Sequence, residues 1–162
     1  MALGDFTLLR EGQFGVPGAE RYIVASGAAA SIKAGEPVGK ALAAAAVATL
    51  ATNKPVVATD FLAGISSTTS SDTAAAAGVV DVIPVNSDQV WLCAPNNAAL
   101  WDTQAEYNAL VGARVLLDKT AGVYTVLSTD GATSGCVVRP LEVAKYPGKV
   151  AISFRAGCSY LA

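Results

Sequence analysis

The chain has 162 residues, of which 52% are hydrophobic and 15% are charged. A chain of this length buries about 70% of its unfolded surface when it folds, and its composition is far from that of a disordered protein. The formal net charge is -2 and the basic residues are scattered singly, which argues against nucleic-acid binding because such binding requires several Lys or Arg side chains on one face.

The sequence gives no sign of a membrane span or a secretory signal. Its longest nearly apolar run, Ala41 to Ala51, is about half of the ~20 residues that a spanning helix needs. The N-terminus carries Asp5 early and lacks the basic start and the apolar stretch of a signal peptide. We therefore expect no membrane contact and synthesis in the cytoplasm.

Residues 1–20 mix apolar side chains with glycines and a proline, a pattern too broken for a long helix or strand. We interpret this segment as an N-terminal arm that precedes one β-rich domain, residues 21–162. The apolar side chains of the arm must be buried, either against a partner subunit or against the chain's own core. Both arrangements remain open, and we expect a contact with another subunit for Phe6, Leu8, Leu9 and Phe14.

From Arg21 onward, short segments rich in valine and isoleucine alternate with turn residues, which is typical of an antiparallel β protein. A turn is predicted at 34–37, where Gly35 can take a positive φ and Pro37 restarts an extended chain. Residues 40–52 are ambiguous, and the pattern weakly favours extended structure. The segments that predict strands in this half are 22–25, 31–33, 55–59, 79–85 and 90–94.

A tract of serines and threonines at 66–73 interrupts these segments. Small polar side chains at this density bury little by themselves, so the tract is predicted to be a solvated loop or edge. Tightly spaced strands in a subunit contact are the alternative.

One helix is predicted after Thr103, because Thr103 and Glu106 have the spacing of a capping box. Gly112 can end this helix, and Tyr107 and Leu110 lie on its apolar side.

The C-terminal part is predicted to be mostly strand. Residues 114–117 and 123–127 form a hairpin across 118–122, and residues 146–149 carry Pro and Gly where a type II turn requires them. A strand over 150–155 follows. The whole pattern predicts a mainly-β fold, a single β-barrel or β-sandwich domain with one short helix and the N-terminal arm.

The sequence lacks the residues that most catalytic and metal sites use. It contains no histidine, the commonest general base and metal ligand. Neither a Ser-x-x-Lys pair nor a Gly-x-Ser-x-Gly elbow is present, and the stretch 35–41 has too few residues between its glycines for a phosphate loop. We therefore expect no enzyme activity, no cofactor and no metal. Buried thiols are expected for Cys93, Cys136 and Cys158.

Two other kinds of site remain as alternatives. Asp118, Asp130 and Glu142 flank the predicted hairpins and could converge as the carboxylate pair of a glycosidase, although solvated turn positions are commoner for such residues. The chain could instead be a carbohydrate-binding or adhesin-like β module, although core or interface anchors are the commoner use of such aromatic residues. The side chains that could stack on a sugar are Trp91, Trp101 and Tyr107.

Three stretches in the first half of the chain share a style of sequence. They are Ile-Lys-Ala-Gly-Glu-Pro-Val-Gly at 32–39, Thr-Asp-Phe-Leu-Ala-Gly-Ile at 59–65 and Ala-Gly-Val-Val-Asp-Val-Ile-Pro at 77–84. These stretches resemble capsid decoration (cement) proteins of tailed phages. In that family a phrase such as Ala-Gly-x-Pro-Val begins a β-hairpin, and a Gly-Ile or Gly-Val phrase begins another strand. The resemblance covers about residues 20–95.

This resemblance implies a small β-barrel or β-sandwich body, usually a homotrimer, seated where major capsid subunits meet. The expected function is that of a structural virion protein, made in the host cytoplasm, that binds and stabilises the bacteriophage capsid shell. The expected partner is the major capsid protein, and the apolar residues of the arm are expected to contribute to the contact between subunits or with the capsid.

Overall fold

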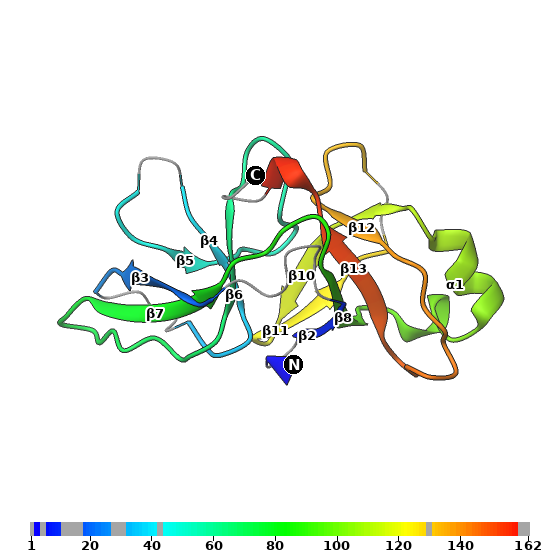
Figure 1. Cartoon of the computed structure of the whole chain (residues 1–162), viewed down its shortest axis with the longest axis horizontal. Coiled ribbons are helices and arrows are strands. Elements are labelled where there is room, and N and C mark those ends of the chain that lie inside the picture. Colours follow the sequence, from blue (N-terminus) through cyan, green and yellow to red (C-terminus); the bar gives the residue numbers. More distant parts are fainter. Residues whose placement is uncertain are drawn as a thin grey trace.

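The computed structural model describes residues 2–3, 6–10, 18–26, 32–41, 44–128 and 131–158. This part of the chain is mainly β: two sheets lie side by side, with helix α1 (Gln104–Leu110) at one end of the molecule (Figure 1). One sheet is nearly closed into a barrel. The predicted mainly-β fold with one short helix is therefore confirmed.

The larger sheet has eight strands and combines the two ends of the chain. Its hydrogen-bonded order is β1-β2-β8-β13-β12-β9, and β11 pairs with both β8 and β10. A second path therefore runs β10-β11-β8-β13-β12-β9. Only Leu116 separates β9 from β10, so the two ends of this second path are joined and the sheet curls around its core. The strands are β1 (Ala2–Leu3), β2 (Phe6–Arg10), β8 (Val90–Pro95), β9 (Arg114–Val115), β10 (Leu117–Thr120), β11 (Val123–Val126), β12 (Cys136–Val138) and β13 (Val150–Phe154).

The smaller sheet has five antiparallel strands in the order β3-β7-β6-β4-β5. A parallel bridge between Val24 and Val47 connects its two outer strands, and the Val47 N–H donates to the Ile23 carbonyl over 2.8 Å. The strands are β3 (Glu20–Val24), β4 (Pro37–Gly39), β5 (Ala48–Thr49), β6 (Leu62–Ser66) and β7 (Gly78–Ile83).

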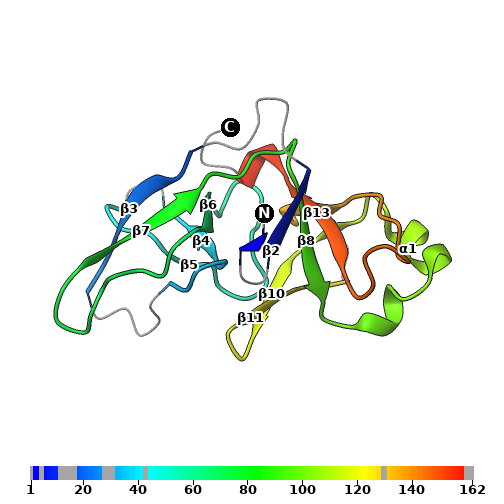
Figure 2. The ribbon, with the colours of Figure 1, turned by 60° about the horizontal axis from the view of Figure 1, so that its bottom comes forward.

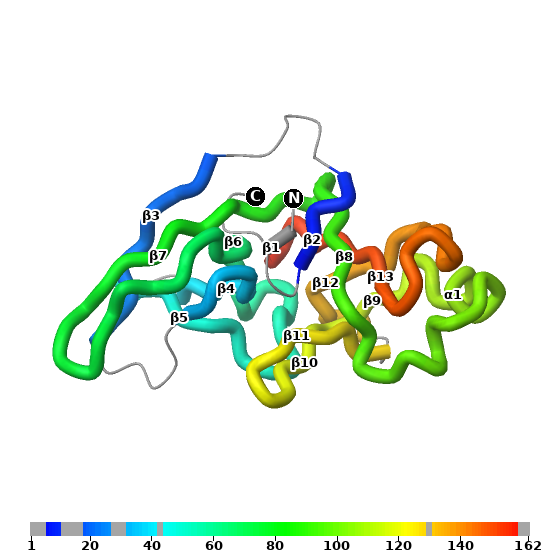
Figure 3. Tube along the Cα trace, turned by 90° about the horizontal axis from the view of Figure 1, so that it is seen from below, coloured from blue at the N-terminus to red at the C-terminus, as the bar shows by residue number. Residues whose placement is uncertain are grey.

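In the chain order, the five-stranded sheet is inserted between β2 and β8 of the larger sheet. Figures 2 and 3 show β2 running beside β8, while β3 and β7 lie at the end of the molecule far from α1. The predicted boundary between residues 20 and 21 falls inside β3, after its first residue, and β2 of the predicted arm is a strand of the larger sheet.

Residues 54–57 return from the smaller sheet to the larger one. Lys54 forms a bridge with Leu117 and Val56 with Ser134, so this segment lies between the start of β10 and the residues before β12. The strand predicted at 55–59 is therefore wrong: the segment makes isolated bridges and then a turn.

Two hydrophobic clusters are buried. The larger cluster contains the big aromatic side chains of the eight-stranded sheet and also includes Leu62 and Ile65 of β6, so it reaches into the smaller sheet. The smaller cluster is built mostly from valines of the five-stranded sheet: Val24, Ile32, Val38, Val47, Ala63, Val80 and Val82. Branched side chains of this size suit the narrow interior of a small, strongly curved sheet.

Polar contacts connect the two sheets. Lys119 Nζ lies 3.2 Å from Glu36 Oε1 and 5.0 Å from the centre of the Tyr124 ring. The Tyr124 hydroxyl donates to the Leu50 carbonyl over 2.5 Å. These contacts hold β4 and the residues after β5 against the β10–β11 hairpin.

The predicted helix is confirmed as α1. The Thr103 hydroxyl accepts from the Glu106 N–H over 3.2 Å and donates to its carboxylate over 2.7 Å, and Gly112 follows with a φ of 88°. Two 3-10 helices, η1 (Ala98–Leu100) and η2 (Ala156–Cys158), complete the described elements. No helix in the described ranges combines the length and the apolar character that a membrane crossing demands.

The predicted turns are confirmed, but one of them is shorter than predicted. Gly35 and Gly148 have positive φ in the two turns that precede Pro37 and β13. In the β10–β11 hairpin, Thr120 pairs with Val123, so the turn is shorter than predicted and residues 118–120 belong to β10. The predicted strand at 31–33 is not formed in its described part, residues 32–33.

The Ser/Thr tract pairs with β7 instead of forming a free loop. The backbone N–H groups of Ser67 and Ser71 donate to the carbonyls of Asp81 and Val79 over 2.8 and 3.0 Å. The Thr68 and Ser71 hydroxyls accept from the N–H groups of Asp81 and Val79, both over 3.0 Å. Hydroxyl groups therefore replace carbonyls in part of this ladder, which explains why short polar side chains occupy the tract.

Candidate functional site

The apolar residues of β2 pack into the chain's own core. Phe6 and Leu8 are buried, and the Phe6 ring lies 6.4 Å from the Tyr124 ring and 6.5 Å from the Phe154 ring between centroids. Leu9 is partly buried against the same cluster. This is the arrangement expected if the N-terminal segment folds back on its own domain.

Phe14 lies outside the described residues. Four residues were predicted to contact another subunit or the capsid. Among the three that the structure describes, Leu9 is the one that is only partly buried. Phe6 and Leu8 contribute their apolar surface within the chain.

The aromatic residues of the carbohydrate alternative do not form a stacking platform, because Trp91, Trp101 and Tyr107 are all buried. The rings of Trp101 and Tyr107 meet edge to face with centroids 5.7 Å apart. The Tyr107 hydroxyl donates to the Arg139 carbonyl and accepts from the Ala151 N–H, both over 2.9 Å. These side chains are core anchors.

Asp118 is not suited to be the general acid of a glycosidase carboxylate pair. One oxygen of Asp118 accepts from the Thr52 hydroxyl and the other accepts from the Thr120 hydroxyl. These hydrogen bonds lower the pKa of Asp118, whereas the acid of a glycosidase pair needs a raised pKa. Glu142 lies in an exposed turn before Tyr146, and Asp130 is outside the described residues.

No metal-binding cluster of acidic or cysteine side chains is found within the described ranges. Cys93, Cys136 and Cys158 are buried, as expected. Burial raises the pKa of Cys158 to about 11 and that of Cys136 well above its usual value. The thiols of Cys136 and Cys158 are therefore protonated at neutral pH, and the thiol is a much weaker nucleophile than the thiolate.

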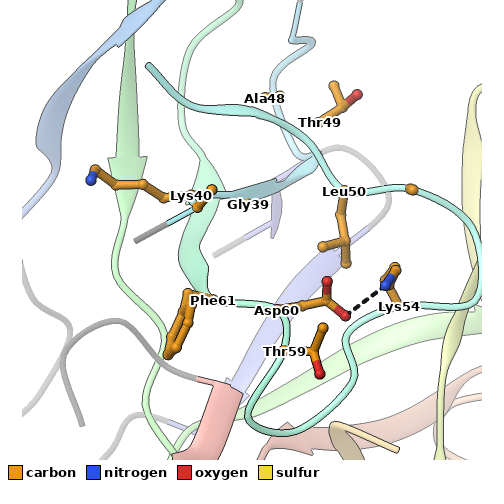
Figure 4. A pocket seen from close by; sticks show the side chains of 11 residues that line it. Gly39, Lys40, Ala48, Thr49, Leu50, Lys54, Thr59, Asp60 and Phe61 are labelled. Carbon is orange, nitrogen blue, oxygen red and sulfur yellow. Dashed lines mark ion pairs between the residues drawn. The ribbon is translucent and has the colours of Figure 1, made fainter. Parts of the chain in front are cut away.

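A small hollow of about 220 Å³ lies beside β4 and β5 (Figure 4). Leu50 and Phe61 contribute apolar surface, and Lys54 Nζ lies 3.0 Å from the Asp60 carboxylate. Asp60 also accepts from the Val56 N–H over 2.8 Å, so the ion pair holds the turn at 56–60 in place. The hollow is smaller than the ~300–1,000 Å³ typical of ligand pockets, and the charges of Lys54 and Asp60 neutralise each other.

The outer side of β3 and β7 carries a pair of exposed apolar residues that sequence reasoning missed. Ile23 and Val79 are direct cross-strand partners and are 54% and 39% exposed. Beside them, Arg21 binds Asp81 through two hydrogen bonds of 2.8 and 3.1 Å. We call Arg21, Ile23, Val79 and Asp81 the β3–β7 face.

The sequence contains a signal for this face. Val79 and Val80 are consecutive, and successive side chains of a strand point to opposite sides, so one of the two must leave the core. The structure places Val80 inside and Val79 outside. The hydrogen bonds from Arg21 lower the pKa of Asp81, so the ion pair is fully charged at neutral pH.

Comparison of the chain with protein-family models, with curated proteins and with solved structures finds no match.

Proposed function

We propose that this chain is a structural protein of a bacteriophage virion, a decoration (cement) subunit that binds the capsid shell from outside and stabilises it. One spatial observation carries the proposal. The stretches 32–39, 59–65 and 77–84, which resemble capsid decoration proteins, lead into or form β4, β6 and β7. These three strands are neighbours in the five-stranded sheet. The resemblance therefore falls on one contiguous piece of the molecule.

Stabilisation follows from selective binding. A subunit that binds the assembled shell and not the free capsid protein shifts the equilibrium toward the shell, by an amount that grows with its concentration over Kd. If the chain acts as a homotrimer, simultaneous attachment at several capsid subunits multiplies modest single contacts. The partner in this proposal is the major capsid protein.

The N-terminal segment can contribute to the shell contact through Leu9. Its neighbours Phe6 and Leu8 fill the core, so they hold β2 in position while Leu9, partly buried, offers the rest of its side chain to a partner. Phe14 remains a predicted contact residue.

The experiment is co-sedimentation of the purified chain with expanded empty shells of the phage that carries its gene, followed by heating of decorated and bare shells. Binding that saturates at a fixed number of copies per capsid subunit, together with a higher disruption temperature, is the expected result. A folded protein that stays in the supernatant at all concentrations would overturn the proposal.

Two substitutions locate the contact. Leu9→Asp should weaken shell binding, whereas Val123→Asp, at a 47% exposed valine of the β10–β11 hairpin, is the matched control and should bind normally. Equal binding by both variants would show that Leu9 is not part of the contact. The proposed function would then be judged by the co-sedimentation of the wild type alone.

A further inference from the structure

We infer that the β3–β7 face is a contact between copies of this chain, in which a second copy covers Ile23 and Val79. The inference rests on the proposed function for its place in a virion, where several copies lie on one shell. A contact between two identical faces has two-fold symmetry, so this face joins copies in pairs and is separate from any contact that would build a homotrimer. The physical argument for the face depends only on the structure of the chain.

The centre of the face is apolar and accessible. Ile23 and Val79 lie directly opposite each other on adjacent strands, so their side chains form one continuous surface. The exposed alanines at 74–77 come immediately before β7, at the tip of the β6–β7 hairpin, and extend the uncharged surface. An exposed cluster of this kind marks an interaction site more often than scattered single residues do.

The charges of the face make it compatible with a copy of itself. Arg21 and Asp81 neutralise each other, so two such faces can meet without burying an unpaired charge. Each face also offers one positive and one negative group beside the apolar pair. Arg21 of one copy can therefore pair with Asp81 of the other, which gives the complementarity that orients an interface.

The position of the face also suits a contact between copies. β3 is the outer strand beside β7, at the end of the molecule far from α1 (Figure 3). A stable interface takes about 800 Å² from each partner, so a contact here must extend beyond Ile23 and Val79 to neighbouring residues such as the exposed alanines at 74–77. A contact at this end leaves the eight-stranded sheet free for a different partner.

The test is the mass of the purified chain in solution without shells, measured by sedimentation velocity over a range of concentrations. The wild type should sediment with at least twice the mass of one 16.3 kDa chain. Val79→Lys should weaken association by about 30-fold or more, because a buried charge would then lack a partner. Val123→Lys, an equally drastic change at an exposed valine elsewhere, should associate normally.

A charge exchange shows whether the partner is the same face. Arg21→Asp gives a face with two negative groups, and Asp81→Arg gives a face with two positive groups. Each variant alone should be monomeric, and an equimolar mixture of the two should associate again. Circular dichroism and unfolding midpoints close to those of the wild type would show that both variants are folded.

Three outcomes would overturn the inference: a monomeric wild type, association of Val79→Lys at wild-type strength, or a mixture that stays monomeric. If a monomeric wild type binds shells and Val79→Lys does not, the face belongs to the capsid contact, and the proposed function stands without this inference. If the wild type associates but ignores shells, the inference stands and the proposed function fails.

Discussion

Lys119 and Glu36 form an ion pair across the two sheets, with 3.2 Å between Nζ and Oε1. The side chain of Glu36 is only 5% exposed, and that of Lys119 is 20% exposed. The two partners therefore differ in their access to water. Glu36 also accepts a hydrogen bond from the Lys33 N–H over 3.1 Å, which fixes it at the turn before β4.

This difference predicts unequal costs for removing the two partners. Lys119→Met leaves a buried carboxylate without its counter-charge and should lower the free energy of unfolding by about 3 kcal/mol. Glu36→Gln leaves a lysine that can turn toward solvent, so its cost should be clearly smaller. Urea denaturation of both variants measures the difference, with Lys149→Met, at an exposed lysine, as the control. Equal losses would mean that water reaches both groups equally.

The packing of Phe6 predicts a large effect of a substitution close to the N-terminus. Phe6→Ala should lower the free energy of unfolding by about 3–5 kcal/mol, because it opens a cavity between the Tyr124 and Phe154 rings. Leu9→Ala, at a partly buried position, should cost about 1 kcal/mol. Equilibrium unfolding of the isolated chain measures both. A fully stable Phe6→Ala variant would show that β2 does not belong to this core in solution.

The turn of the β10–β11 hairpin offers a stabilising substitution. Ala121 and Gly122 have φ of 50° and 82°, the positive values that a type I′ turn requires at both central positions. Alanine tolerates this region poorly and asparagine tolerates it well, so Ala121→Asn should raise the free energy of unfolding by up to about 1 kcal/mol. Gly122→Ala, which places a second alanine at a positive φ, should lower it. Thermal melts of the wild type and the two variants measure this: the unfolding midpoint should be highest for Ala121→Asn and lowest for Gly122→Ala.

The buried thiols predict a loss of stability in alkali. Cys158 has its pKa raised from 9.0 to about 11, so between these two pH values the unfolded chain releases a proton that the folded chain keeps. The unfolded state then binds fewer protons, and the free energy of unfolding falls as the pH rises through this window. Burial also raises the pKa of Cys136 and Tyr107, which acts in the same direction.

Urea midpoints at pH 8, 9, 10 and 11 measure this loss. The urea midpoint of Cys158→Ala should fall less steeply with rising pH than that of the wild type, whatever the stability of the variant at pH 8. Parallel slopes would assign the alkaline loss to other groups.

Local signals were enough to predict some elements from the sequence. The capping pair of Thr103 and Glu106 and the turn glycines Gly35 and Gly148 act within a few residues, and the structure contains the corresponding helix and turns. The fold class follows from the same short-range alternation.

The location of the candidate surfaces depends on pairings between distant parts of the chain. The burial of Phe6 follows from the pairing of β2 with β8, and nothing near Phe6 in the sequence indicates that partner. Trp91 and Trp101 are buried for the same reason, since the strands and the helix that cover them come from different segments. The exposure of Ile23 and Val79 is decided by which side of the five-stranded sheet faces its own valine core. Such choices belong to the tertiary fold, and local sequence does not determine them.

In the chain, the strands of the smaller sheet come between β2 and β8 of the larger sheet. The strands of the two sheets therefore emerge in a fixed order during synthesis. β2 is complete at residue 10, but β8 begins only at residue 90, so at about 5–20 residues per second the ribosome needs roughly 4–16 s to deliver the partner of Phe6. All five strands of the smaller sheet emerge within that interval and can pair first. If the smaller sheet pairs first, the apolar side chains of β2 have no partner strand until β8 has emerged. The larger sheet closes only when β13, close to the C-terminus, has left the ribosome.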